Sequence, residues 1–84
     1  MADDILRFIK QTENHGMVTR EFASPDGVVF ITVAPAAEMV SVVLNSAFNE
    51  HKKVRTLTLA EYEAHCKLVD GKLKPKRSLL KEFF

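Results

Sequence analysis

The chain has 84 residues, of which 46% are hydrophobic and 27% are charged, and its formal net charge is +1. This length predicts one domain, residues 1–84, with a small core, and the apolar content together with the low net charge disfavours disorder. A single cysteine excludes an intrachain disulfide, and no apolar run reaches the roughly 20 residues that a membrane-spanning helix needs. The acidic start of the chain lacks the positive charge of a signal peptide, so we expect a cytoplasmic protein with no membrane partner.

The first predicted element is a helix over residues 4–14. An apolar stripe between Ile5 and Ile9 recurs at helical spacing after an N-capping aspartate. Gly16 then supplies a left-handed stop after the predicted helix.

Two strands are predicted next, over residues 17–23 and 28–34, around the turn sequence Ser24-Pro25-Asp26-Gly27. Proline presets φ at the second turn position, and Gly27 takes the positive φ that returns the chain to a strand. The second strand is apolar on both faces, so we expect it to lie in the middle of the sheet.

Residues 36–49 are predicted to form a second helix. Pro35 suits a first helical turn, and apolar residues then recur at intervals of three and four. The valines in this segment are weak helix formers, so a strand over 39–44 is the alternative. The polar Asn45 and Ser46 favour the helix.

The remaining chain is predicted to contain a strand over 54–59 and a short helix over 59–67. The helix follows a capping box formed by Thr58 and Glu61. Asp70-Gly71 indicates a turn that joins 68–69 to 72–73 in a small hairpin.

Residues 73–84 are predicted to be a basic linker followed by an apolar terminal turn, which Ser78 caps. Together the elements predict an α+β fold: a small three-stranded sheet, made of a hairpin and one further strand, packed by two or three helices. The predicted order is α-β-β-α-β-α.

Catalytic and metal-binding motifs are missing from the sequence. The three histidines and Cys66 have none of the CxxC, HxxxH or HExxH spacings that metal sites use. Three isolated glycines exclude both the GxGxxG pattern and the P-loop. A lone cysteine on a helix is more often a small core residue than a nucleophile. We therefore expect no enzyme, no metal and no cofactor.

Charge is distributed unevenly along the chain. Residues 1–50 hold seven acidic and three basic side chains, a net charge of −4, whereas residues 51–84 hold four and nine, a net charge of +5. The basic half ends in an apolar sequence, which docks either on the chain's own core or on a partner, including a second copy. The residues predicted to bind a partner are Lys72, Lys74, Lys76, Arg77, Leu79, Leu80, Phe83 and Phe84.

These features predict a small non-enzymatic module that acts by occupying a surface of a protein partner, with an acidic partner suiting the basic residues. A homodimer, through the apolar terminus or through the 17–23 strand, is a further expectation. Compact chains of this kind suit phage- or mobile-element-encoded inhibitors of host machinery, although no particular residue carries that expectation. The alternative function is nucleic-acid binding through the basic region from Lys67 to Lys81.

Overall fold

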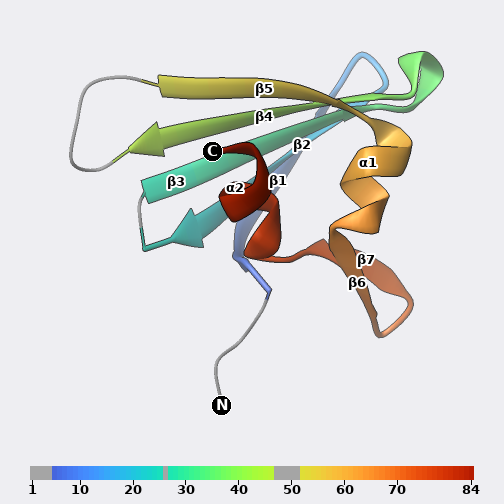
Figure 1. The fold of residues 1–84 in the computed structure, drawn as a ribbon. Helices are drawn as coiled ribbons and strands as arrows, with labels where there is room; N and C mark the ends of the chain where they lie inside the picture. The colour runs from blue at the N-terminus through green and yellow to red at the C-terminus, as the bar shows by residue number, and fades with distance from the viewer. Residues whose placement is uncertain (1–4, 26, 47–51) are drawn as a thin grey trace.

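The computed structural model describes residues 5–25, 27–46 and 52–84. Within them the chain forms a five-stranded antiparallel sheet, a separate two-stranded hairpin and two short α-helices (Figure 1). In chain order the elements are β1 (Arg7–Asn14), β2 (Met17–Ser24), β3 (Gly27–Ala34), the 3₁₀ turn η1 (Pro35–Ala37), β4 (Met39–Ser46), β5 (Lys52–Thr58), α1 (Leu59–Ala64), β6 (Cys66–Val69), β7 (Lys72–Pro75) and α2 (Ser78–Phe83). The fold is mostly β, so the predicted α+β class with a three-stranded sheet is wrong.

The large sheet is a meander in which each strand pairs with the next one along the chain, in the order β1-β2-β3-β4-β5. The predicted hairpin is confirmed, since β2 and β3 pair from Val18 opposite Val33 to Ser24 opposite Gly27. Gly27 has φ 144°, a conformation that glycine reaches without a side-chain clash. The apolar β3 lies in the middle of the sheet, as its two-sided hydrophobicity predicts.

The predicted helix over residues 4–14 is wrong, because the described part of this segment contains strand β1 instead. β1 pairs with β2 through a two-residue turn in which His15 and Gly16 both have positive φ, 52° and 77°, as a type I′ hairpin requires. The pairing shifts between Phe8 and Lys10, which marks a β-bulge. This extra residue interrupts the alternation of the strand, so its apolar residues imitate helical spacing.

The predicted helix over residues 36–49 is also wrong. The chain makes the short turn η1 and then forms β4, so the alternative strand over 39–44 is confirmed. Val40, Val42 and Leu44 are buried at alternate positions, which is the pattern of a strand with one face in the core. The last residues of the predicted helix, 47–49, lie outside the described ranges.

The elements after β4 follow the predictions more closely. The third predicted strand is confirmed as β5, which runs antiparallel to β4. α1 begins with the predicted capping box: Glu61 N–H donates to Thr58 Oγ1 at 3.1 Å, and Thr58 N–H donates to Glu61 Oε1 at 2.9 Å. The small hairpin is confirmed as β6–β7, but it is longer than predicted. The helix predicted over 59–67 ends at Ala64, residues 66–67 belong to β6, and the start of the predicted basic linker belongs to β7.

α2 confirms the predicted terminal helical turn, although its cap differs. Arg77 rather than Ser78 is the N-cap residue, and it makes no side-chain capping hydrogen bond. Leu6, near the start of the described residues, lies beside this region, because its N–H donates to the carbonyl of Pro75 at 3.0 Å.

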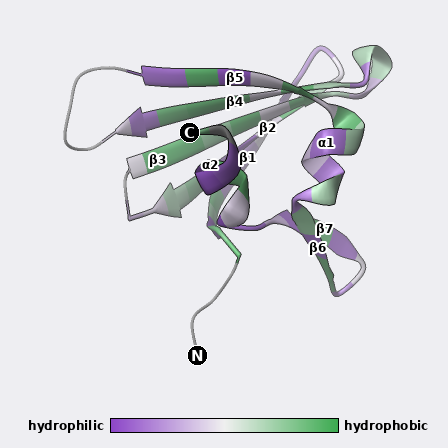
Figure 2. Ribbon diagram, in the orientation of Figure 1, coloured by the Kyte–Doolittle hydropathy of each residue, from purple (hydrophilic) through white to green (hydrophobic). Residues whose placement is uncertain are grey.

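Both helices lie on the same face of the sheet (Figure 1). The core lies between the helices and that face of the sheet. Figure 2 shows hydrophobic residues along β3 and β4, the strands that cover the core. The core residues are Leu6, Phe22, Val29, Ile31, Val40, Val42, Leu44, Leu57, Tyr62, Leu79 and Leu80. We call the opposite face of the sheet the outer face; no element among the described residues covers it.

Candidate protein-binding surface

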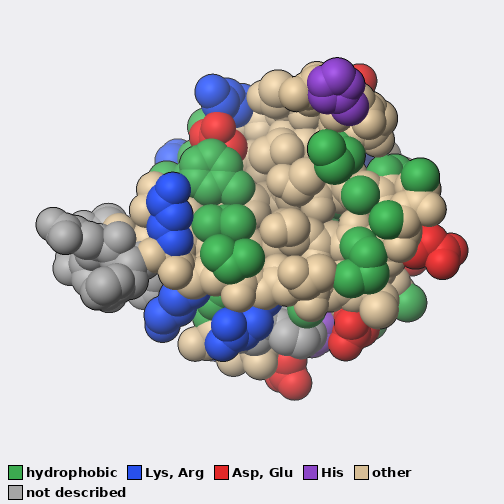
Figure 3. Space-filling view, turned by 90° about the horizontal axis from the view of Figure 1, so that it is seen from above, with side chains coloured by type: hydrophobic (Ala, Val, Ile, Leu, Met, Phe, Trp, Pro, Cys, Tyr) green, Lys and Arg blue, Asp and Glu red, His purple; other side chains and the backbone are tan. Residues whose placement is uncertain are grey.

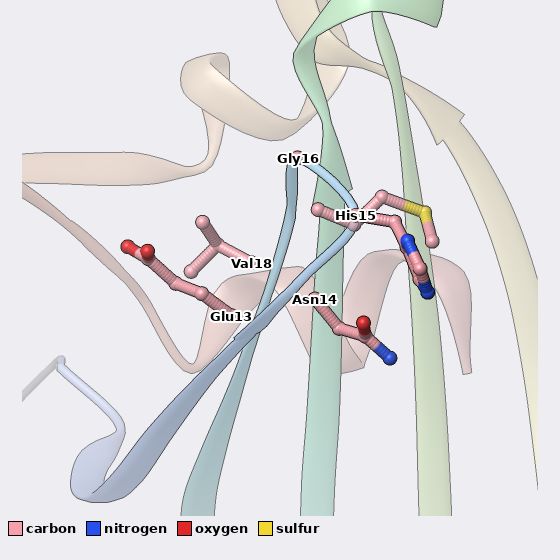
Figure 4. A pocket seen from close by; sticks show the side chains of 6 residues that line it. Glu13, Asn14, His15, Gly16 and Val18 are labelled. Carbon is pink, nitrogen blue, oxygen red and sulfur yellow. The ribbon is translucent and has the colours of Figure 1, made fainter.

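A shallow hollow lies at the β1–β2 turn, lined by residues 13–18. Figure 4 shows the side chains of Glu13 and Val18 on one side of this hairpin and those of Asn14 and His15 on the other. The carboxylate and the imidazole therefore do not face each other. An acid–base pair needs both groups within reach of one substrate atom, so this hollow does not provide one.

Cys66 lies at the start of β6, half-buried against the core. Its thiol donates a hydrogen bond to the carbonyl of Tyr62 at 3.2 Å. Burial is the main cause that raises the pKa of the thiol, so at neutral pH Cys66 is protonated and weakly nucleophilic. This environment favours the interpretation of Cys66 as a small core residue.

The described residues contain no group of three or more side chains that could hold a metal ion. No helix among them has the length and apolar character needed to cross a membrane.

The apolar residues of the predicted partner site belong mainly to this chain's own core. Leu79 is fully buried and Leu80 is 9% exposed, so neither offers its side chain to another molecule. Phe84 packs against the core, and the guanidinium of Arg55 lies 5.7 Å from the centre of its ring. Phe83 lies on α2, and its side chain is outside what the structure describes. Of the two alternatives for the apolar terminus, docking on the chain's own core or on a partner, this arrangement corresponds to the first.

The basic residues of the predicted site are divided between the hairpin and the start of α2. Lys72 and Lys74 lie on β7, whereas Arg77 is exposed just before α2. Lys76 pairs with Ile5 in an isolated bridge that connects the hairpin to the start of the chain. The structure therefore brings Lys72 and Lys74 together on one element and places the other two beside it.

Strand register determines which side chains share a face of the β6–β7 hairpin. Lys67 lies directly opposite Lys74, and Lys72 lies two residues from Lys74 on the same strand. Because alternate residues of a strand point to the same side, these three lysines share one face. We call this set, Lys67, Lys72 and Lys74, the lysine face.

The other face of the hairpin carries a pair of exposed leucines, Leu68 and Leu73, which lie directly opposite each other. Their exposed fractions are 66% and 42%. On the same face, nearer the body of the domain, Pro75 is buried. The hairpin thus begins in the core and carries an apolar pair, which we call the leucine pair, away from it (Figure 1).

Among the described residues, none of the three lysines of the lysine face forms a salt bridge, whereas Lys10 and Glu21 form one at 3.5 Å on another part of the molecule. Like charges directly opposite each other across two strands repel, and Lys67 and Lys74 stand in that relation. An anionic group between them would relieve the repulsion.

The prediction from sequence included two of the three lysines of this face but missed the leucine pair. The sequence does contain a pattern that indicates this pair. Leu68 lies two residues before Asp70 and Leu73 two residues after Gly71, and each leucine is next to a lysine. In the sequence, however, the same leucines fit equally well as part of the core.

Comparison with known proteins adds no assignment, because no protein-family model, no curated protein and no solved structure matches this chain.

Proposed function

We propose that this protein is a small non-enzymatic binding module that acts by occupying a surface of a protein partner through the β6–β7 hairpin. The observation that carries the proposal is the exposed leucine pair on an element whose other face holds three lysines that form no salt bridge among the described residues. Occupying a partner's surface is how an inhibitor without catalytic groups works, and we keep an inhibitor of host machinery, encoded by a phage or mobile element, within this proposal.

The two faces of the hairpin define the chemistry of the partner. Burying an exposed leucine contributes on the order of 1.5–3 kcal/mol, so two adjacent leucines can anchor a complex. The lysine face favours carboxylates at the edge of the contact, where charges mainly affect association rate and specificity. The matching partner surface is an apolar groove bordered by acidic residues.

Nucleic-acid binding is the weaker alternative for the same hairpin. Lysines bind phosphates, but a phosphate backbone offers no apolar surface to Leu68 and Leu73. Single-strand binders instead stack bases on aromatic side chains, and residues 66–75 contain none.

The test is affinity capture from the native host with two folded variants as bait. In the first variant, Leu68→Ser and Leu73→Ser together remove the apolar anchor without touching the core. The matched control is Val54→Ser, because Val54 is 52% exposed but lies on β5, away from the hairpin. We expect the wild type and the control to retain the same protein and the leucine variant to lose it.

Two results would contradict the proposal. Retention of the captured protein by the leucine variant would show that the hairpin is not the contact. Salt-sensitive binding of labelled DNA or RNA that survives removal of the leucines would favour the nucleic-acid function instead.

A further inference from the structure

The outer face of the large sheet has a regular pattern that the hairpin does not explain. Strand register places its side chains in rows that run across the strands. From β1 to β5, the first row is Lys10, Glu21, Phe30, Val43 and Val54, and we call it the apolar row after its last three members. The hydroxyl row is Thr12, Thr19, Thr32, Ser41 and Thr56. The methionine row is Asn14, Met17, Ala34, Met39 and Thr58. The hydroxyl row lies between the other two, and Figure 3 shows it as a tan column with hydrophobic side chains on both sides.

This face is accessible and its apolar groups are large. Val54, Met17 and Met39 are 52%, 41% and 36% exposed. In the hydroxyl row, Thr19 and Thr32 are joined by a hydrogen bond between their hydroxyl oxygens at 3.0 Å, so the row is already ordered. A sheet face with two groups of exposed apolar side chains is a candidate interaction surface.

Charges of opposite sign lie at the two ends of the face. Arg7 and Lys52 share the row beyond the apolar row, opposite Ala23 and Asn45 respectively. Glu38 lies at the other end, in the turn just before the methionine row. Figure 3 shows most of the basic side chains at the first end, together with one acidic side chain beside the hydrophobic column, and further acidic side chains toward the second end.

We propose that the outer face is the interface of a homodimer in which a second copy stacks on it with its strands antiparallel. The two-fold axis lies in the interface, perpendicular to the strands, and passes over the hydroxyl row. This operation keeps each strand over the same strand of the partner and places the hydroxyl row on itself. Phe30 and Val43 of each copy then lie over Ala34 and Met39 of the other, and Glu21 lies over Met17. It also places the basic end of each copy over the acidic end of its partner.

The charge pattern selects this arrangement over the other face-to-face stacking. A two-fold axis parallel to the strands would place Lys52 and Arg7 of both copies at the same end, and the acidic ends would also coincide. Like charges brought together at an interface oppose association. Two sheets packed face to face with nearly aligned strands are the ordinary geometry of a β-sandwich, about 10 Å thick.

The size of the face limits how strong the dimer can be. Five strands about 4.8 Å apart and four rows about 6.7 Å apart cover roughly 500–600 Å² on each copy. The total is close to the roughly 1,000 Å² that marks the lower end of specific interfaces. We therefore expect a weak dimer whose population depends on protein concentration.

Sedimentation over a range of concentrations tests the dimer. The wild type is expected to approach twice the 9.5 kDa mass of one chain as concentration rises. Val54→Glu should raise the dissociation constant roughly tenfold or more, because it places a carboxylate in the interface beside Met39 of the partner copy. The matched control, Leu68→Glu, changes an apolar residue that is more exposed than Val54 (66% against 52%) and lies on the hairpin, outside the face. Its dimerisation, as distinct from its partner binding, should equal that of the wild type. The proposal is overturned if the wild type stays monomeric, or if the two variants have equal dissociation constants.

Charge reversal tests the orientation of the two copies. At low salt, Glu38→Lys alone and Lys52→Glu alone should each weaken the dimer roughly threefold, by repulsion at the interface rim. The double variant exchanges the two signs and should recover the wild-type dissociation constant. If the double variant instead dimerises more weakly than either single variant, the antiparallel arrangement is overturned. Because the dimer uses the outer face and partner binding uses the hairpin, either proposal can fail alone.

Discussion

Tyr62 places its hydroxyl group in the core, where the group makes no hydrogen bond among the described residues. The residue is 4% exposed, and among the described groups its hydroxyl has no hydrogen-bond partner. Desolvation is the main cause that raises the pKa of the phenol above its usual value of 10.0; the neighbouring Cys66 thiol raises it further, and the nearby Arg20 guanidinium lowers it. A buried hydroxyl that loses its water without a replacement costs on the order of 1–3 kcal/mol. The ring of Tyr62 therefore stabilises the fold while its hydroxyl opposes it.

Tyr62→Phe is expected to raise the free energy of unfolding by about 1 kcal/mol, because it keeps the ring and removes the unsatisfied hydroxyl. Urea denaturation measures this change. The control is Cys66→Ala, which removes the neighbouring thiol and leaves the hydroxyl in place. A variant less stable than the wild type would show that the hydroxyl does have a partner.

The same substitution predicts a change in alkaline stability. The folded state holds the Tyr62 proton at pH values where the unfolded chain has released it, so this contribution is complete below the usual pKa of 10.0 and is lost as the pH rises above it. We expect Tyr62→Phe to flatten the loss of stability above that pH. An unchanged pH profile in a thermal melt would contradict the assignment.

At the scale of single elements, the β2–β3 and β6–β7 hairpins were predictable, whereas strands β1 and β4 were not. The Ser24–Gly27 turn and the Asp70-Gly71 turn identify their hairpins because their residues suit the φ values that such turns need. β4 was predicted to be a helix because Val43, on the outer face, adds an apolar residue between the buried Val42 and Leu44. The alternation of a strand is then hidden, and the apolar residues also fit the three- and four-residue spacing of a helix. β1 was misread because of its bulge and because its eight residues are all exposed. Local periodicity cannot identify a strand that owes its conformation to pairing with β2.

The candidate hairpin surface shows the same limit. Its lysines could be predicted because a cluster of charge is visible in the sequence. The leucine pair could not, because whether a leucine is exposed depends on where the hairpin leaves the body of the domain. For Leu79 and Leu80 the opposite holds: apolar residues near the end of the sequence suggested a contact, and the packing of α2 buries them.

The capping box that starts α1 should account for much of the stability of that short helix. Thr58→Ala removes the hydroxyl that accepts from Glu61 N–H, and N-cap losses of this kind cost about 1 kcal/mol. Thermal melting measures the loss, and Thr56→Ala on the same strand is the matched control. Equal melting temperatures for the two variants would contradict a stabilising role for the cap.

The cap also predicts the acid response of α1. Hydrogen bonds from the backbone and side chain of Thr58 lower the pKa of Glu61 below its usual value of 4.5. A lowered pKa in the folded state gives a contribution that is present above the usual pKa and is lost as the pH falls. Thr58→Ala should therefore also weaken the dependence of stability on pH in the acidic range.

For the molecule as a whole, α2 completes a core that the sheet cannot complete alone. Leu79 is fully buried, and substitutions of such a residue by alanine cost roughly 2–5 kcal/mol. A core of this size supplies only about 3–5 kcal/mol, so Leu79→Ala should leave the chain largely unfolded at 37 °C. Circular dichroism measures the loss, and Leu73→Ala on the exposed leucine pair is the control. A cooperative melt at the wild-type temperature would contradict the role of α2.

The strand order of the meander has a kinetic consequence. Each pairing in the large sheet joins neighbouring segments, so closing its loops costs little entropy, whereas the contact between Leu6 and Pro75 joins segments that are far apart in the chain. We expect the sheet to form before the main barrier to folding and α2 to dock after it. Leu79→Ala, studied at low temperature, should then speed unfolding and leave the refolding rate nearly unchanged. The leucines of α2 would in that case determine how long each folded molecule lasts, and the meander how quickly it forms.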